Sequence, residues 1–128
     1  MRLLLDTHAF IWWDSEPARL PHAARAACED LNNCLLFSVA GVWEMQIKLQ
    51  LGKLQLIVPL GEIIGTQQES NNLQVLPVGL EHVLALEDLP SYHKDPFDRL
   101  IIAQARVEDA VVVTNDAVFS RYPVQVLW

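Results

Sequence analysis

Short apolar runs alternate along the chain with segments whose apolar residues recur every three or four positions. The runs RLLLD, CLLFS, LQVLP, AVVVTND and VQVLW have the length and apolar character of buried β-strands. The helical segments between them span residues 8–14, 22–31, 39–51, 60–71, 80–88 and 96–107. This alternation predicts an α/β fold, with a mostly parallel sheet and helices on both faces. The stretch QLGKLQLIVPLG, with two glycines and Pro59, is expected to be an irregular connection.

Two of the predicted strands end in polar sequence with an aspartate. Three leucines precede Asp6, and three valines precede the sequence TND that ends at Asp116. The simpler interpretation of each acid is local, because Asp6 or Thr7 would cap the following helix and Asp116 would form a turn or cap a short helix. Open parallel sheets, however, bind ligands in a crevice beyond the carboxyl ends of their strands. Both aspartates are predicted to lie at such an end.

A third acid lies in the segment HKDPFDRLIIAQAR. Asp95 followed by Pro96 predicts the cap and first residue of a helix, because proline has a suitable φ and lacks an amide hydrogen that would be unpaired there. Asp98 falls on the same helical face as Ile101 and Ile102, which is expected to pack on the sheet. A capping interaction is the alternative for Asp98. An acid on the core side of a first turn is nevertheless well placed to point into the crevice.

The fourth acid, Glu44, lies in the segment SVAGVWEMQIKLQLGK. Ser38 is a suitable helix cap, and Glu44 then occupies an apolar face where alanine or leucine would be expected. An ordinary ion pair with Lys48, one turn later, is the alternative interpretation. Gly41 weakens this helix by roughly 0.5–1 kcal/mol relative to alanine, which suggests close packing of its backbone.

Together these acids predict a divalent metal site. Carboxylate ligands suit Mg²⁺ or Mn²⁺, which bind through a few carboxylates together with substrate phosphate. Such an ion would offset the repulsion among the acids and would give phosphate a cation to bind. The overall charge of the chain would otherwise repel nucleic acid, because 16 acidic against 9 basic residues give a formal net charge of −7. That charge argues against a simple basic cradle for nucleic acid.

The remaining composition predicts one domain that stays in the cytoplasm. A chain of 128 residues predicts a single domain over 1–128. No apolar run approaches the roughly 20 residues of a membrane span, and the start of the chain lacks the pattern of an export signal. Cys28 and Cys34 have neither CxxC spacing nor a second pair, so we expect two reduced thiols.

In their order, the segments LLLDTHAFIWW, SVAGVWEMQIK, HKDPFDRLIIAQA and VVTND resemble the PIN domain, and within it the VapC-type toxins of bacterial toxin–antitoxin pairs. The resemblance runs from Leu3 to Asp116 and implies a three-layer α/β/α sandwich. It implies endoribonuclease activity on single-stranded or structured RNA, with Mg²⁺ or Mn²⁺ held by the catalytic acids Asp6, Glu44, Asp98 and Asp116. Thr7 and Asn115 would be polar supports of the site.

The resemblance also implies partners, because toxins of this family usually form homodimers that a VapB-like antitoxin inhibits. One apolar side of the helix after Asp98, with Leu100, Ala103 and Val107, predicts a surface for such a homodimer. RNA backbone contacts are expected from three basic residues near the acids, Lys48, Lys94 and Arg99, with solvated surface charge as the alternative. The rival function is a PIN-fold binding module that acts through a protein partner and has no useful nuclease activity.

Other functional classes find less support in the sequence. The motifs GxxxxGK[ST], GxGxxG and GxSxG are absent, which argues against the common nucleotide-binding loops and a serine hydrolase. A phosphotransfer receiver domain would need paired acids after the first strand and a lysine after a late one, whereas this chain has DTH and TND. The histidines do not share helical ligand spacing, and His8 is expected to pack or to support the site.

Overall fold

Five parallel strands form the centre of the computed structural model, which describes residues 1–128. Across the sheet they lie in the order β3-β2-β1-β4-β5, and each neighbouring pair is parallel. The central position of β1 explains why its three leucines are fully buried. The strands are β1 (Arg2–Leu5), β2 (Cys34–Ser38), β3 (Gln74–Leu76), β4 (Val111–Val113) and β5 (Val126–Leu127).

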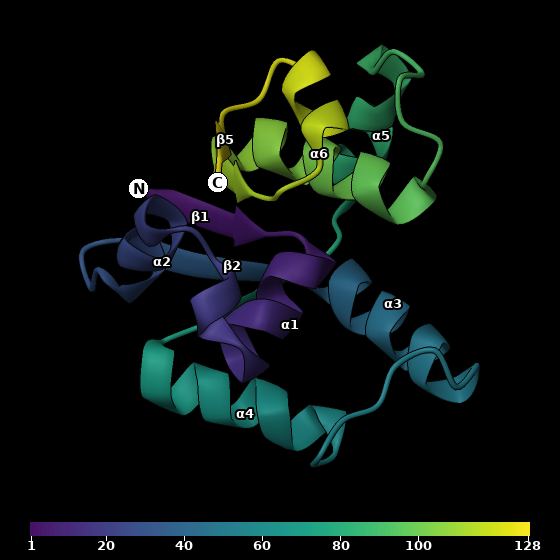
Figure 1. Ribbon diagram of the computed structural model, residues 1–128. Coiled ribbons are helices and arrows are strands. Elements are labelled where there is room, and N and C mark those ends of the chain that lie inside the picture. The colour runs from purple at the N-terminus through teal and green to yellow at the C-terminus, as the bar shows by residue number, and fades with distance from the viewer.

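Helices cover both faces of the sheet, as Figure 1 shows. One face carries α1 (Thr7–Ser15), α2 (His22–Glu29) and α4 (Leu60–Asn71), and the other carries α5 (Leu80–Leu84) and α6 (Pro96–Glu108). α3 (Val39–Gln50) begins at the carboxyl end of β2, and its Trp43 contacts Phe97 of α6 with ring centroids 5.3 Å apart. Three short 3₁₀ helices span Pro17–Arg19, Ala85–Asp88 and Ala117–Arg121. None of the helices combines the length and apolar character that a membrane span requires.

The two faces of the sheet contribute to separate cores. Leu3 and Leu5 pack in the first core and Leu4 packs in the second, because successive side chains of a strand point to opposite faces. The first core also contains Phe10, which stacks on Phe37 with ring centroids 4.0 Å apart. The architecture is therefore the three-layer α/β/α sandwich that the resemblance implied.

The predicted strands and helices are all present, with small differences at their ends. The predicted helix 80–88 is divided, because α5 ends at Leu84 and a 3₁₀ helix follows. The irregular connection is confirmed as residues 51–59, which contain neither helix nor strand. Both cysteines are free thiols.

The dimer surface predicted on α6 is wrong in one residue. Ala103 is completely buried in the second core, among other residues of the same chain. Val107 is 41% exposed and Leu100 is half-buried, so only part of the predicted surface is accessible.

Candidate functional site

Asp6 lies at the carboxyl edge of the sheet, where β1 and β4 are neighbours. Its N–H donates to the carbonyl of Val113 at 3.1 Å, which fixes it beside the end of β4. Its Oδ1 accepts the N–H of Ala9 at 2.8 Å and so caps α1. Its Oδ2 accepts the Thr114 hydroxyl at 2.5 Å. Asp6 is thus a helix cap and a member of the strand-end cluster at once.

Burial makes the charge on Asp6 costly. The residue is only 5% exposed, and this desolvation raises the pKa of its carboxyl above the ordinary value of 3.8, although hydrogen bonds from Thr114 and Ala9 oppose the rise. The nearby Asp116 carboxylate raises the pKa further. A cation bound at this edge of the sheet would therefore stabilise the ionised form of Asp6.

Thr114 supports the site in a way that the sequence did not predict. Its buried hydroxyl donates to Asp6 and accepts the N–H of Asp116 at 3.0 Å, which ties the two aspartates together. Asn115, the polar support implied by the resemblance, is exposed. One sequence signal could have identified Thr114. It carries a hydroxyl and directly follows a strongly β-branched strand, at a position that is buried at the edge of the sheet.

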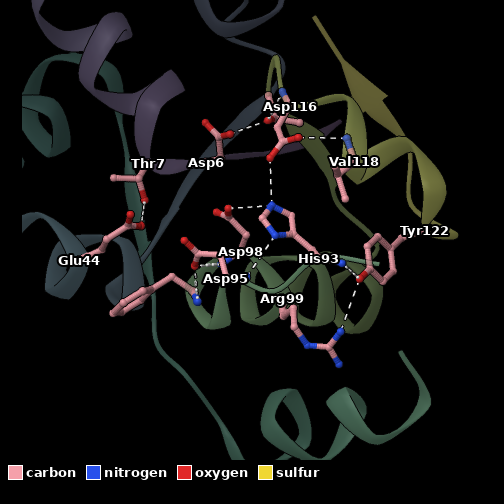
Figure 2. A network of polar contacts seen from close by, with 12 residues as sticks. Asp6, Thr7, Glu44, His93, Asp95, Asp98, Arg99, Asp116, Val118 and Tyr122 are labelled. Atoms are coloured by element: carbon pink, nitrogen blue, oxygen red, sulfur yellow. Dashed lines mark hydrogen bonds and ion pairs between the residues drawn. The ribbon is translucent and has the colours of Figure 1, made fainter. Parts of the chain in front are cut away.

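Glu44 reaches the site from α3, which Ser38 caps by accepting the N–H of Ala40 at 3.1 Å. The glutamate is 8% exposed. Its Oε1 accepts the Thr7 hydroxyl at 2.7 Å, and its Oε2 lies 2.9 Å from Nζ of Lys48. Both Thr7 and the predicted ion pair therefore orient this carboxylate, and Figure 2 shows it facing the strand-end acids.

The two acids of DPFD differ in their contacts. Asp95 caps α6, since its Oδ1 accepts the N–H groups of Phe97 at 2.8 Å and Asp98 at 3.1 Å. Asp98 instead points toward the other acids (Figure 2). Burial, followed by the charges of Asp95, Glu44 and Asp6, raises the pKa of Asp98 to about 7, while His93 opposes the rise. The site therefore holds more negative charge than its protein partners balance.

Asp116 and an unpredicted histidine complete the cluster. The Oδ1 of Asp116 accepts the N–H of Val118 at 3.0 Å, which caps the 3₁₀ helix that follows. Its Oδ2 lies 2.9 Å from Nε2 of His93, and the same nitrogen lies 3.0 Å from Oδ2 of Asp98. Helical spacing could not identify His93, because it precedes α6 in an irregular segment. The sequence signal that could have identified His93 is its position two residues before Asp95.

The three basic residues expected to contact RNA have different surroundings. Lys48 is paired with Glu44, whereas Lys94 is exposed. The guanidinium of Arg99 donates to the carbonyls of Pro90 at 2.9 Å and Leu89 at 3.4 Å, so it holds the segment before α6. Contact with RNA stays a prediction for all three side chains.

The arrangement offers hard oxygen donors from four segments of the chain. Carboxylates of this kind suit Mg²⁺ or Mn²⁺ and the chemistry of phosphate groups. The side chains of Asp98 and Asp116 are 21% and 35% exposed, so solvent and a large substrate can reach them. The acids thus form an open edge of the sheet and not an enclosed cavity for a small molecule.

Comparisons with known proteins point to one family. A model of the PIN domain matches residues 3–125. Ribonuclease VapC22 from Mycobacterium tuberculosis (strain ATCC 25618 / H37Rv) is 30% identical over 115 residues, which cover 89% of this chain and 86% of that protein.

Solved structures show the same fold at lower identity. VapBC2 from Rickettsia felis, bound to a promoter DNA fragment, matches with a TM-score of 0.75 at 20% identity, over 99% of this chain and 98% of the other. VapBC-1 from nontypeable Haemophilus influenzae has a TM-score of 0.67 at 19% identity, over 99% and 97%. FitAcB from Neisseria gonorrhoeae has a TM-score of 0.64 at 22% identity, over 98% and 96%. With a family model along nearly its whole length, a relative of 30% identity and this fold, the chain belongs to the PIN domain family.

Proposed function

We propose that this protein is a Mg²⁺- or Mn²⁺-dependent endoribonuclease of the cytoplasm, acting on single-stranded or structured RNA as the toxin of a type II toxin–antitoxin pair. The relative named Ribonuclease VapC22 supports the class of reaction. The observation that carries the proposal is the approach of carboxylates from four separate segments, where burial and then the neighbouring acids raise the pKa of Asp98 to about 7. These carboxylates are Asp6, Glu44, Asp98 and Asp116.

The chemistry of this donor set fits a divalent cation. Each donor is a carboxylate oxygen. Lys48 offsets part of the charge, and Nε2 of His93 lies close to the carboxylates of Asp98 and Asp116. A cation among the acids would relieve the repulsion that Asp98 experiences from Asp95, Glu44 and Asp6. We therefore assign the metal-binding role to the four acids and the capping role to Asp95.

The chain's own residues would orient the reaction. When bound, the ion supplies a Lewis acid for phosphate oxygens and lowers the pKa of its water, which is the chemistry of metal-assisted phosphodiester hydrolysis. Thr114 holds Asp6, and Thr7 holds Glu44, so that these carboxylates keep one orientation. Exposed Lys94 would contact the RNA backbone beside the acids.

The direct test is cleavage of mixed RNAs by the purified protein with Mn²⁺, with and without EDTA. We expect Asp98→Asn and Asp6→Asn to lower the rate by roughly 100-fold, the equivalent of about 3 kcal/mol. Glu108→Gln is the matched control, because it removes a carboxylate from the opposite end of the same helix. Cleavage that survives both chelation and the substitutions contradicts the metal mechanism. Intact partner binding without cleavage of any RNA favours the binding module.

We also propose two protein partners. The first is a VapB-like antitoxin, in keeping with the VapBC and FitAB complexes among the relatives of this fold. We expect a basic segment of that antitoxin to reach the acidic edge of the sheet through its arginines, which pair well with carboxylates. The second is another copy of this chain, so light scattering at micromolar concentration should report twice the chain mass. A stable monomer, or antitoxin affinity that is independent of those arginines, contradicts the corresponding proposal.

A further inference from the structure

His93 occupies the space between two of the four acids. Its Nε2 lies 2.9 Å from Oδ2 of Asp116 and 3.0 Å from Oδ2 of Asp98, as the dashed lines of Figure 2 show. The two carboxylates come from different segments, the end of β4 and the first turn of α6. Since like charges repel, one donor shared by both carboxylates stabilises their approach.

The surrounding chain fixes His93 through its main chain and through its ring. The main-chain N–H of His93 donates to the Tyr122 hydroxyl at 2.8 Å, and its ring meets Phe119 edge to face, with centroids 5.8 Å apart. Its Nδ1 accepts the N–H of Asp95 at 3.2 Å. The side chain is 15% exposed. The imidazole is therefore held in one orientation by groups outside the acidic cluster.

These contacts also determine which nitrogen carries the proton. Because Nδ1 of His93 accepts a hydrogen bond, the proton of the imidazole lies on Nε2. A nitrogen that carries a proton has no lone pair for a metal ion, but it can donate to a carboxylate. His93 thus donates from Nε2 to Asp116, with Oδ2 of Asp98 3.0 Å from the same nitrogen, and it has no lone pair there with which to act as a fifth ligand.

Asp98 depends on this donor more than the other acids do. Asp6 accepts from Ala9 and Thr114, and Asp116 accepts from Val118 as well as from His93. Glu44 likewise has two partners, Thr7 and Lys48. For Asp98, His93 is the single side-chain partner. Without it, no polar side-chain contact would hold the Asp98 carboxylate toward β4.

We propose that His93 is a positioning residue, whose Nε2–H aligns the carboxylates of Asp98 and Asp116 for a divalent cation. This inference rests on the metal site of the proposed function and adds a residue outside its four acids. Outer hydrogen-bond partners of metal ligands typically change affinity by about 10–100-fold when removed. The sequence H-x-D-P-x-D therefore encodes a donor at His93, a helix cap at Asp95 and a metal ligand at Asp98.

The first experiment measures Mn²⁺ affinity by calorimetry for the wild type, His93→Ala and His93→Gln. We expect His93→Ala to weaken Mn²⁺ binding by about 10–100-fold. His93→Gln should recover much of that loss, because its side-chain amide places an N–H donor near the original Nε2. His22→Gln, on the exposed start of α2, is the control and should bind like the wild type. Equal loss in the alanine and glutamine variants would overturn the hydrogen-bonding role.

The same titration separates this inference from the proposed function. A wild-type protein that does not bind Mn²⁺ overturns the metal site itself. A wild type that binds Mn²⁺ with an affinity equal to that of His93→Ala overturns the role of His93 alone.

A second experiment needs neither a variant nor activity. Nitrogen NMR of the protein labelled in its histidines should show His93 protonated at Nε2 and unprotonated at Nδ1, both without metal and with saturating Mg²⁺. An Nε2 without a proton, either before or after Mg²⁺ binds, would leave its lone pair free for the ion and overturn the inference.

Discussion

Two clusters of one histidine and two acids lie at opposite ends of α6, and they differ in the charge that balances them. At the first turn, His93 lies between Asp98 and Asp116. At the last turn, buried His82 donates to Glu108 across 2.8 Å, with exposed Glu81 nearby. The same residue types thus form two sites on one helix.

The cluster at the last turn contains its own cation. Arg2 Nη1 donates to the Glu108 carbonyl at 2.7 Å and lies 3.1 Å from its Oε1. Hydrogen bonds from His82 and then Arg2 lower the pKa of Glu108 below its ordinary value of 4.5. Burial and neighbouring acids raise the pKa of Asp98 instead. A helix favours acids at its first turn and cations at its last, so the local partners outweigh the helix dipole at both ends.

The difference between these clusters distinguishes a structural network from a candidate binding site. Arg2 completes the cluster of Glu108, and no external ion is required. The cluster of Asp98 has excess negative charge on an open edge of the sheet, so an ion or a cationic partner would stabilise it. Composition alone could not separate the two clusters, because the deciding residue, Arg2, lies at the other end of the chain.

The largest predicted effect is on stabilisation by metal. At a concentration of about 100 times the dissociation constant, a bound ion stabilises the folded protein by about 2.7 kcal/mol. Asp98→Asn should remove most of the resulting rise in melting temperature, whereas Glu108→Gln should retain it. Scanning calorimetry across a Mn²⁺ titration gives both values. If Asp95→Asn abolishes the rise and Asp98→Asn preserves it, the assignment of ligand and cap is reversed.

The two clusters should also respond to pH with opposite signs. The pKa of Asp98 is raised from 3.8 to about 7 in the folded protein, so its contribution to metal-free stability is complete below about pH 4 and is lost as pH rises through about 7. The lowered pKa of Glu108 means that its contribution is present above about pH 4.5 and is lost in acid. Urea unfolding in EDTA between about pH 3 and pH 8 should therefore show Asp98→Asn gaining stability relative to the wild type as pH rises. A constant difference between these proteins contradicts the assignment.

Removing the balanced acid should cost stability without affecting metal binding. Glu108→Gln weakens charge-assisted hydrogen bonds from His82 and Arg2, so we expect a loss of about 1–2 kcal/mol in the free energy of unfolding. The loss should be equal with and without Mn²⁺. A loss that appears only with Mn²⁺ would mean that this cluster also binds the ion.

The smallest predicted effects separate capping from charge at Asp95. Asp95→Ala removes the acceptor for two N–H groups of α6 and should cost on the order of 1 kcal/mol, whereas Asp95→Asn should be nearly neutral because asparagine caps about as well. Chemical unfolding of both variants at neutral pH measures the difference. Equal destabilisation by alanine and asparagine would show that the charge of Asp95, and not its capping oxygen, stabilises the helix.

Periodicity predicted the fold well because the sheet is buried on both faces, which makes each strand a continuous apolar run. The packing suggested for Gly41 also agrees with the structure, since a β-carbon there would lie 2.5 Å from the Phe37 ring. The sequence pattern could not predict contacts between residues that lie far apart in the chain. The position of His93 depends on Phe119 and Tyr122, which follow far along the chain, and Ala103 is buried in a core that includes residues outside its own helix.

The sequence also could not predict which of several neighbouring polar side chains faces the site. TND offers three polar side chains in a row, and only the turn after β4 decides that Thr114 faces inward while Asn115 faces solvent. Position at a strand end therefore predicted that Asp6 and Asp116 would lie close together, but not the neutral residue, Thr114, that holds them.

The place of β1 between β2 and β4 has a consequence for synthesis of the protein on the ribosome. Asp6 is made well before the strand that brings Asp116 beside it. At about 5–20 residues per second, roughly 5–20 s separate the two. During that interval no partial chain contains the complete set of acids. If the protein cleaves RNA as proposed, a ribosome making it must pass Asp116 before the product can attack any transcript.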